Sequence, residues 1–178
     1  MKADMFSRLL FKPWAFIPVA IGVAVSLAPE AVLRSTVIVW LVNAIARVVP
    51  VIDVYVANTS FAVQASTFVA LMLVATPLQY VAMLRAWRKL GMSDYYLTLY
   101  RSSRVHTGRT RNGGALFLFF GALVATYAFA NSPSVCSGCS HQHYWFLVLE
   151  MSAGQAFMLW AWQHLIFFYS NLHNINSL

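Results

Sequence analysis

Long apolar segments alternate with short polar ones along this chain. Four segments, at about 14–33, 61–84, 113–131 and 144–169, carry almost no charged residues. A helix needs about 20 apolar residues to cross the roughly 30 Å hydrocarbon core of a bilayer. The pattern therefore predicts four transmembrane helices at these positions.

A further apolar segment, at about 35–57, has a different pattern. Its more polar positions recur at helical spacing on one face and are Thr36, Trp40, Asn43 and Arg47. A charged residue such as Arg47 is costly in the middle of a bilayer. A fifth span would also put basic loops on both sides of the membrane. We therefore expect an interfacial or re-entrant helix on the outer face, between spans 1 and 2.

The composition supports a membrane environment. Hydrophobic residues make up 60% of the 178 residues and charged residues only 10%, whereas a soluble domain usually carries about a quarter charged residues. The fold class predicted is an all-α integral membrane protein, with a single domain over 1–178. The net charge of +7 fits basic residues retained at a cytoplasmic membrane edge, so a nucleic-acid partner is not indicated.

Most of the positive charge lies in the loop 85–112, which has a single acidic residue, Asp94. Its basic residues are Arg85, Arg88, Lys89, Arg101, Arg104, Arg109 and Arg111. Short loops rich in Lys and Arg stay in the cytoplasm, which predicts a bacterial inner-membrane protein with both termini cytoplasmic. Tyrosines and leucines between the cations predict a short surface helix with Ser93 as its N-cap. Anionic lipid headgroups are the partner we expect there.

A short outer loop before the fourth span gathers four side chains that bear chemistry: Cys136, Cys139, His141 and His143. The CxxC spacing favours thiol–disulfide exchange, and two thiolates with two imidazoles could complete a zinc site. An oxidised pair could also simply staple the loop. Membrane thiol oxidases of the disulfide-bond-forming and vitamin K epoxide reductase type relay electrons through a second cysteine pair, which this chain lacks. These interpretations stay open, and no cofactor is predicted.

Two ionisable residues lie inside the fourth apolar segment, Glu150 and His164. An ionisable group within a membrane is a candidate functional residue. The helical face that bears Glu150 also carries Gly154 and Ala161, and small residues allow helices to approach closely. We expect this face to pack against other helices, with Glu150 in a hydrogen bond or ion pair inside the bundle or to a partner subunit. A proton path through Glu150 and His164 is the alternative.

No nucleophile elbow, phosphate-binding loop, dinucleotide fingerprint or HExxH pattern occurs in the chain. The function expected is therefore that of a non-enzymatic inner-membrane protein. It would serve as a small subunit or accessory factor of a membrane assembly, such as a secretion or conjugal-transfer apparatus, or as an exclusion or immunity factor. The alternative is a membrane thiol–disulfide oxidoreductase or metal-binding protein that uses the outer cysteine loop.

Overall fold

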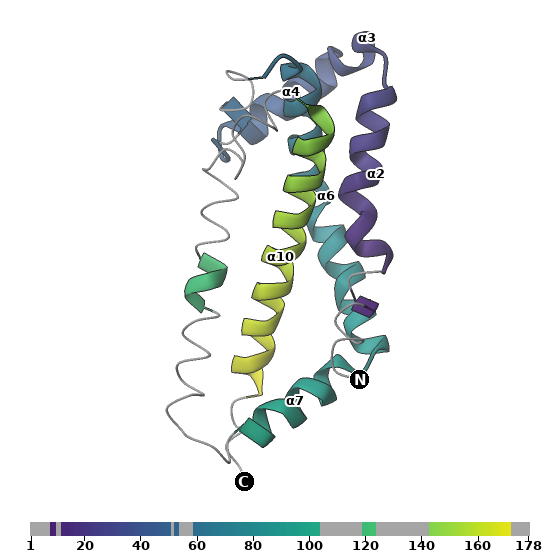
Figure 1. The fold of residues 1–178 in the computed structure, drawn as a ribbon. Coiled ribbons are helices and arrows are strands. Elements are labelled where there is room, and N and C mark those ends of the chain that lie inside the picture. Colours follow the sequence, from purple (N-terminus) through teal and green to yellow (C-terminus); the bar gives the residue numbers. More distant parts are fainter. Residues whose placement is uncertain are drawn as a thin grey trace.

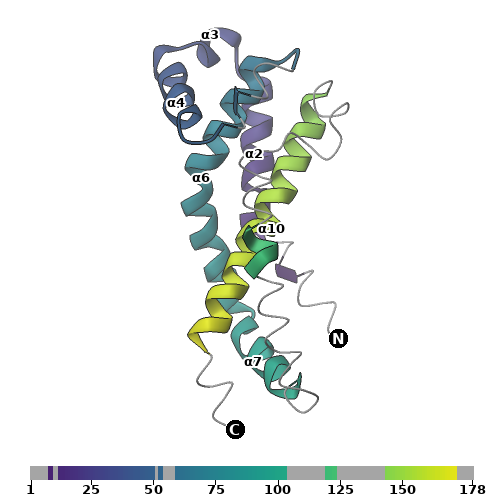
Figure 2. The same cartoon turned by 90° about the vertical axis from the view of Figure 1, so that its left-hand side faces the viewer.

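The computed structural model describes residues 8–9, 12–50, 52–53, 59–103, 119–123 and 143–171. Every regular element in these ranges is a helix. Three helices, α2, α6 and α10, run side by side as the body of the molecule (Figures 1 and 2). Helices α3 and α4 lie at one end of this bundle and α7 lies at the other. We name the two ends the α4 end and the α7 end.

Helix α2 (Pro13–Leu27) is shorter than the first predicted span. It stops because Ala28, which precedes Pro29, takes an extended conformation with φ −71° and ψ 134°. A residue before proline is disfavoured in the helical region, since the proline ring clashes with its backbone. The prediction of one continuous helix over 14–33 was therefore wrong. At 15 residues, α2 by itself falls short of the about 20 that a span needs.

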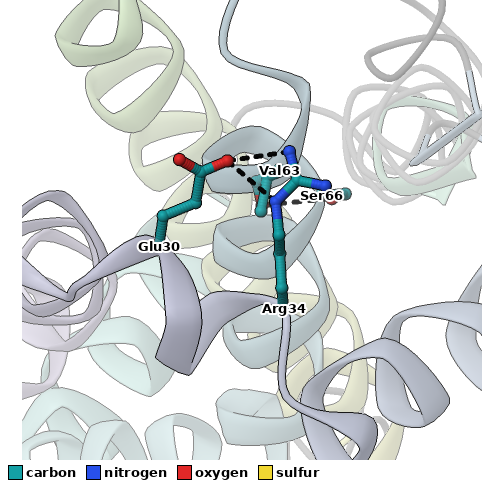
Figure 3. A network of polar contacts seen from close by, with 4 residues as sticks. All are labelled: Glu30, Arg34, Val63 and Ser66. Atoms are coloured by element: carbon teal, nitrogen blue, oxygen red, sulfur yellow. Dashed lines mark hydrogen bonds and ion pairs between the residues drawn. The ribbon is translucent and has the colours of Figure 1, made fainter.

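The segment after Pro29 forms two short helices, α3 (Glu30–Leu33) and α4 (Thr36–Ala46). At 1.5 Å per residue, the 11 residues of α4 extend over about 16 Å, too short to cross a bilayer. Helix α4 lies across the bundle rather than along it (Figures 1 and 2). None of its residues is fully buried. An ion pair joins Glu30 to Arg34 next to the first turns of α6 (Figure 3).

Helices α6 (Ala62–Lys89) and α10 (Tyr144–Ser170) are the two long helices, with 28 and 27 residues. Both run from the α4 end to the α7 end (Figure 1). Among the described residues, α6 alone is both long and apolar enough to cross a membrane. Helix α10 is nearly as long as α6 but less apolar over the length of a span, because the polar residues Glu150, Gln155 and Gln163 lower its mean hydropathy.

A tight turn joins α6 to α7 (Met92–Ser103). Gly91 has φ +60°, a left-handed conformation that glycine adopts without strain and that commonly ends a helix. The next helix begins at Met92, so the predicted N-cap role of Ser93 was wrong. Instead, the Ser93 hydroxyl accepts a hydrogen bond of 3.1 Å from the indole N–H of Trp87. The turn thus leads the chain away from α6, and this hydrogen bond holds α7 beside the end of that helix.

Other parts of the predicted architecture lie outside the described residues. Only the helical residues 119–123 of the predicted third span are described. Four transmembrane spans are therefore a prediction, while the all-helical fold class is observed.

Candidate functional site

Two separate apolar clusters hold the bundle together. The α4-end cluster contains eleven buried residues from five parts of the chain: Val25, Leu33, Ile52, Ala65, Phe68, Val69, Ala70, Met72, Leu147, Val148 and Met151. The α7-end cluster contains nine: Leu9, Trp14, Met83, Ala86, Trp87, Met92, Tyr96, Leu159 and Phe167. On α6 the first cluster ends at residue 72 and the second begins at residue 83. The stretch between them carries the fully buried Gln79.

The best-connected polar contact in this middle layer joins α6 to α10. The Gln155 side-chain Nε2 donates to Thr76 Oγ1 at 2.6 Å and to the Met72 carbonyl oxygen at 3.3 Å. The Thr76 hydroxyl in turn donates to the same Met72 carbonyl at 3.1 Å. Interhelical hydrogen bonds in membrane proteins average about 0.6 kcal/mol and reach about 1.7 kcal/mol. This contact therefore fixes the register of α6 against α10 and adds a modest stability.

A second polar contact lies nearer the α7 end. The Tyr80 hydroxyl donates to Gln163 Oε1 at 2.8 Å. Together with the Thr76–Gln155 contact, it forms what we call the polar layer, defined by Thr76, Gln79, Tyr80, Gln155 and Gln163. All of its groups are neutral amides and hydroxyls. Such groups bind helices or neutral polar molecules. The Thr76 and Tyr80 hydroxyls donate to a carbonyl oxygen and an amide oxygen, which do not activate a hydroxyl as a general base would.

Part of the hydrogen-bonding capacity of the layer is unused. Gln79 is fully buried, and neither its amide nitrogen nor its amide oxygen has a hydrogen-bond partner among the described residues. The same holds for Gln155 Oε1. A buried polar group without a partner costs about 1–3 kcal/mol. The centre of the bundle is therefore held less firmly than its two apolar ends.

His164 is buried within aromatic rings at the α7 end. Its ring centroid lies 4.0 Å from that of Tyr96, 4.6 Å from that of Trp160 and 5.3 Å from that of Trp87. The first and third of these contacts are edge-on, the arrangement that aromatic rings prefer. His164 therefore belongs to the packing that holds α7 onto α6 and α10.

Glu150 lies half-buried on α10, far from His164. The two residues are 14 positions apart on one helix, which corresponds to about 21 Å along the axis. The structure therefore does not bring them together, and the described residues show no continuous path of carboxylates and imidazoles between them.

The packing face of α10 matches the expected one only in part. Ala161 and His164 on the expected face are buried, but Ala153 and Phe157 on that face are exposed, and Val148 and Leu159 on the opposite face are buried. Val148 packs on Gly22 of α2 so closely that a Cβ added to Gly22 would lie 2.6 Å from Val148 Cγ1. At this point the close approach is provided by a glycine on the neighbouring helix rather than by a small residue of α10, and the expected contact of Glu150 stays a prediction.

The basic residues of the predicted loop fall into three groups. Arg85, Arg88 and Lys89 are exposed on the last turns of α6. Arg101 lies in α7. The positions of Arg104, Arg109 and Arg111 lie outside the described residues. The side chains of only the first three cations are therefore described, and the lipid contact of the loop stays a prediction.

The outer cysteine loop also lies mostly outside the described residues. His143 is exposed immediately before α10, whereas Cys136, Cys139 and His141 fall in the undescribed part. Within the described part, no three His, Cys, Asp or Glu side chains come together as a metal site would require. The redox, metal and staple interpretations of this loop stay predictions.

Sequence reasoning missed the buried glutamines. Gln79, Gln155 and Gln163 lie in apolar stretches, a pattern that marks helix contacts or polar interiors in membrane proteins. The signal was present, but an amide carries no charge and so does not stand out as an ionisable group does.

Comparisons with known proteins give no relative for this arrangement. A scan against protein-family models, a search of the curated proteins and a search of the solved structures each found no match. Functional inference must therefore come from the residues themselves.

Proposed function

We propose that the chain is a multi-pass protein of a bacterial inner membrane that works as a non-enzymatic subunit or accessory factor of a membrane assembly. Assemblies of the secretion or conjugal-transfer type, or an exclusion or immunity role, are the settings that the sequence favours. Both termini would lie in the cytoplasm. The proposal uses α6 and α10 as two of the spans and α4 and α7 as surface helices.

The observation that carries the membrane part is an inversion of the usual distribution of polarity. Gln79, Gln155 and Gln163 are buried in the bundle. Large apolar side chains on the same helices point outward and are at least 40% exposed: Val74, Leu78, Val81, Phe146, Leu149, Phe157 and Ile166. Water would favour the reverse arrangement. A lipid solvent favours this one, since hydrocarbon cannot hydrogen-bond to an amide.

The charges at the two ends support the orientation. The described charged residues at the α7 end are Arg8, Lys12, Arg85, Arg88, Lys89, Arg101 and Asp94, which sum to 6 − 1 = +5. Those at the α4 end are Arg34, Arg47, Glu30 and Asp53, which sum to 2 − 2 = 0. Excess Lys and Arg remain on the cytoplasmic side. This difference favours a cytoplasmic α7 end.

A stripe on α10 is the surface that a partner subunit would contact. Phe146, Leu149, Ala153 and Phe157 recur at helical spacing and are exposed. Half-buried Glu150 lies on the same side, and small Ala153 leaves room for another backbone. The stripe therefore favours a protein neighbour over bulk lipid.

Photo-crosslinking in intact cells tests the subunit role. A photoreactive phenylalanine analogue at Phe157 should link the protein to another polypeptide, whereas the same analogue at exposed Leu78 on α6 should link it to lipid. Native sizing after mild detergent extraction should show a matching complex. Recovery of a free monomer, with no polypeptide linked at Phe157, would refute the subunit role.

Cysteine labelling tests the orientation. In a background in which Cys136 and Cys139 are replaced by serine, Ser60→Cys at the α4 end should react with a membrane-impermeant maleimide from outside the cell. Thr98→Cys, exposed on α7, should react only after permeabilisation. Labelling of Thr98→Cys in intact cells would overturn the proposed topology.

A further inference from the structure

The outward face of α6 combines an apolar stripe with a cluster of cations. Val74, Leu78 and Val81 are exposed, and Leu78 is 67% exposed. They follow one another at intervals of four and three residues, so they lie on one side of the helix. The opposite side carries buried residues such as Met83 and Trp87. This stripe is consequently directed away from the centre of the bundle.

The same side of α6 continues into three basic residues. At 100° per residue, Arg85, Arg88 and Lys89 lie within about 60° of the direction of Val74. All three are exposed. Their long side chains start where the apolar stripe ends, at the last turn of the helix. The stripe is apolar over about 10 Å, so part of an acyl chain can lie along it. The cations lie where the headgroup of such a lipid would be.

No ion pair is found for these three cations among the described residues. At the α4 end, by contrast, Arg34 is paired with Glu30 at 2.7 Å. The one described carboxylate at the α7 end is Asp94, which lies in the first turn of α7. Three positive charges on one helix face therefore lack a negative counterpart in this part of the protein.

We propose that this face of α6 is a binding site for an anionic phospholipid. The phosphate would lie against Arg85, Arg88 and Lys89, and an acyl chain would lie along Val81, Leu78 and Val74. Each basic residue near an anionic membrane surface contributes enough to change affinity about fivefold. Three of them on one face are sufficient to select an anionic over a zwitterionic lipid. The site rests on the membrane embedding proposed above.

Native mass spectrometry of the purified, delipidated protein tests the site directly. Titration with phosphatidylglycerol and with phosphatidylcholine of the same acyl chains should show tighter binding of the anionic lipid. Arg85→Gln and Arg88→Gln should each weaken phosphatidylglycerol binding about fivefold and leave phosphatidylcholine binding unchanged. Arg85→Lys should retain binding, because the charge is kept.

The matched control is Arg47→Gln, which removes an exposed arginine at the α4 end and should not alter the binding of either lipid. Equal binding of the two lipids to the unmodified protein would overturn the proposal, as would an equal loss in Arg47→Gln. Equal binding of the two lipids is also the result expected if the cations contact an acidic protein surface instead of a lipid. Carbonate extraction of membranes separates the lipid site from the membrane embedding. If the protein stays in the membrane but binds both lipids equally, the lipid site alone is refuted. If carbonate releases the protein, the membrane embedding is refuted.

Discussion

The two ends of the bundle are built by different means. At the α7 end, large aromatic side chains from three parts of the chain enclose one another, with Trp87 stacked on Tyr96 at 5.2 Å and beside His164. At the α4 end, backbones approach closely: Val148 packs on Gly22, and the Tyr144 hydroxyl donates to the Gly22 carbonyl at 2.9 Å. The aromatic rings thus dominate the packing at the α7 end, whereas a close approach of two helices at Gly22 is added to the apolar cluster at the α4 end.

The surfaces of the two ends differ as well. The α4 end balances its charges and pairs Glu30 with Arg34, while Arg85, Arg88 and Lys89 at the α7 end have no ion pair among the described residues. Helix α4 exposes apolar residues such as Trp40, which is 68% exposed, and packs on its cluster with partly buried residues. Helix α7 instead buries Met92 and Tyr96. The comparison teaches that α7 is held by fully buried side chains and α4 by partly buried ones.

The largest expected effect concerns the aromatic cluster of the α7 end. Trp87→Ala removes the stacking on Tyr96 and the hydrogen bond to Ser93 and leaves a cavity. We expect a loss of about 3 kcal/mol in the free energy of unfolding, measured by denaturant titration in detergent micelles. The control Trp40→Ala at the α4 end should change stability by less than about 0.5 kcal/mol. Equal losses in both variants would abolish the distinction between the two ends.

The next largest effect concerns the close approach at the α4 end. In Gly22→Ala the new Cβ would meet Val148 Cγ1 at 2.6 Å, and a β-branched side chain cannot easily move aside. We expect a loss of about 1–3 kcal/mol in the same unfolding experiment. Val148→Ala in the same chain should restore most of it. Gly121→Ala, where no atom lies within 4 Å of the new Cβ, is the control and should be neutral or stabilising. A Gly22→Ala variant as stable as the control would show that the approach is not tight.

The smallest effect concerns the ion pair of the α4 end. The side chains of Glu30 and Arg34 are 66% and 64% exposed (Figure 3). Exposed pairs one helical turn apart contribute about 0.3–0.5 kcal/mol. Glu30→Gln should therefore lower the free energy of unfolding by no more than about 0.5 kcal/mol, and high salt should erase the difference. A loss as large as that of Gly22→Ala would mean that charge, rather than close packing, fixes this end.

The sequence predicted both ends of α10 and the start of α6 to within one residue. Long apolar segments of this kind have few ways to satisfy their backbone hydrogen bonds other than a helix. The end of α6 was missed by five residues, since Arg85 to Lys89 continue the helix although they are charged. The end of α2 was also missed, although Pro29 already marked it. The apolar pattern alone did not reveal that a proline ends a helix inside an apolar segment.

Composition and periodicity alone determined that this chain is helical, largely apolar and more basic in one region, since these properties depend on residue types and their spacing. The tertiary structure decided which faces meet. It buried Val148 and Leu159 while leaving Ala153 and Phe157 exposed, joined Gln155 to Thr76, and enclosed His164 with Trp87 and Tyr96. The physical reason is that contact between helices depends on the shape of both surfaces, and a single helix shows only one of them.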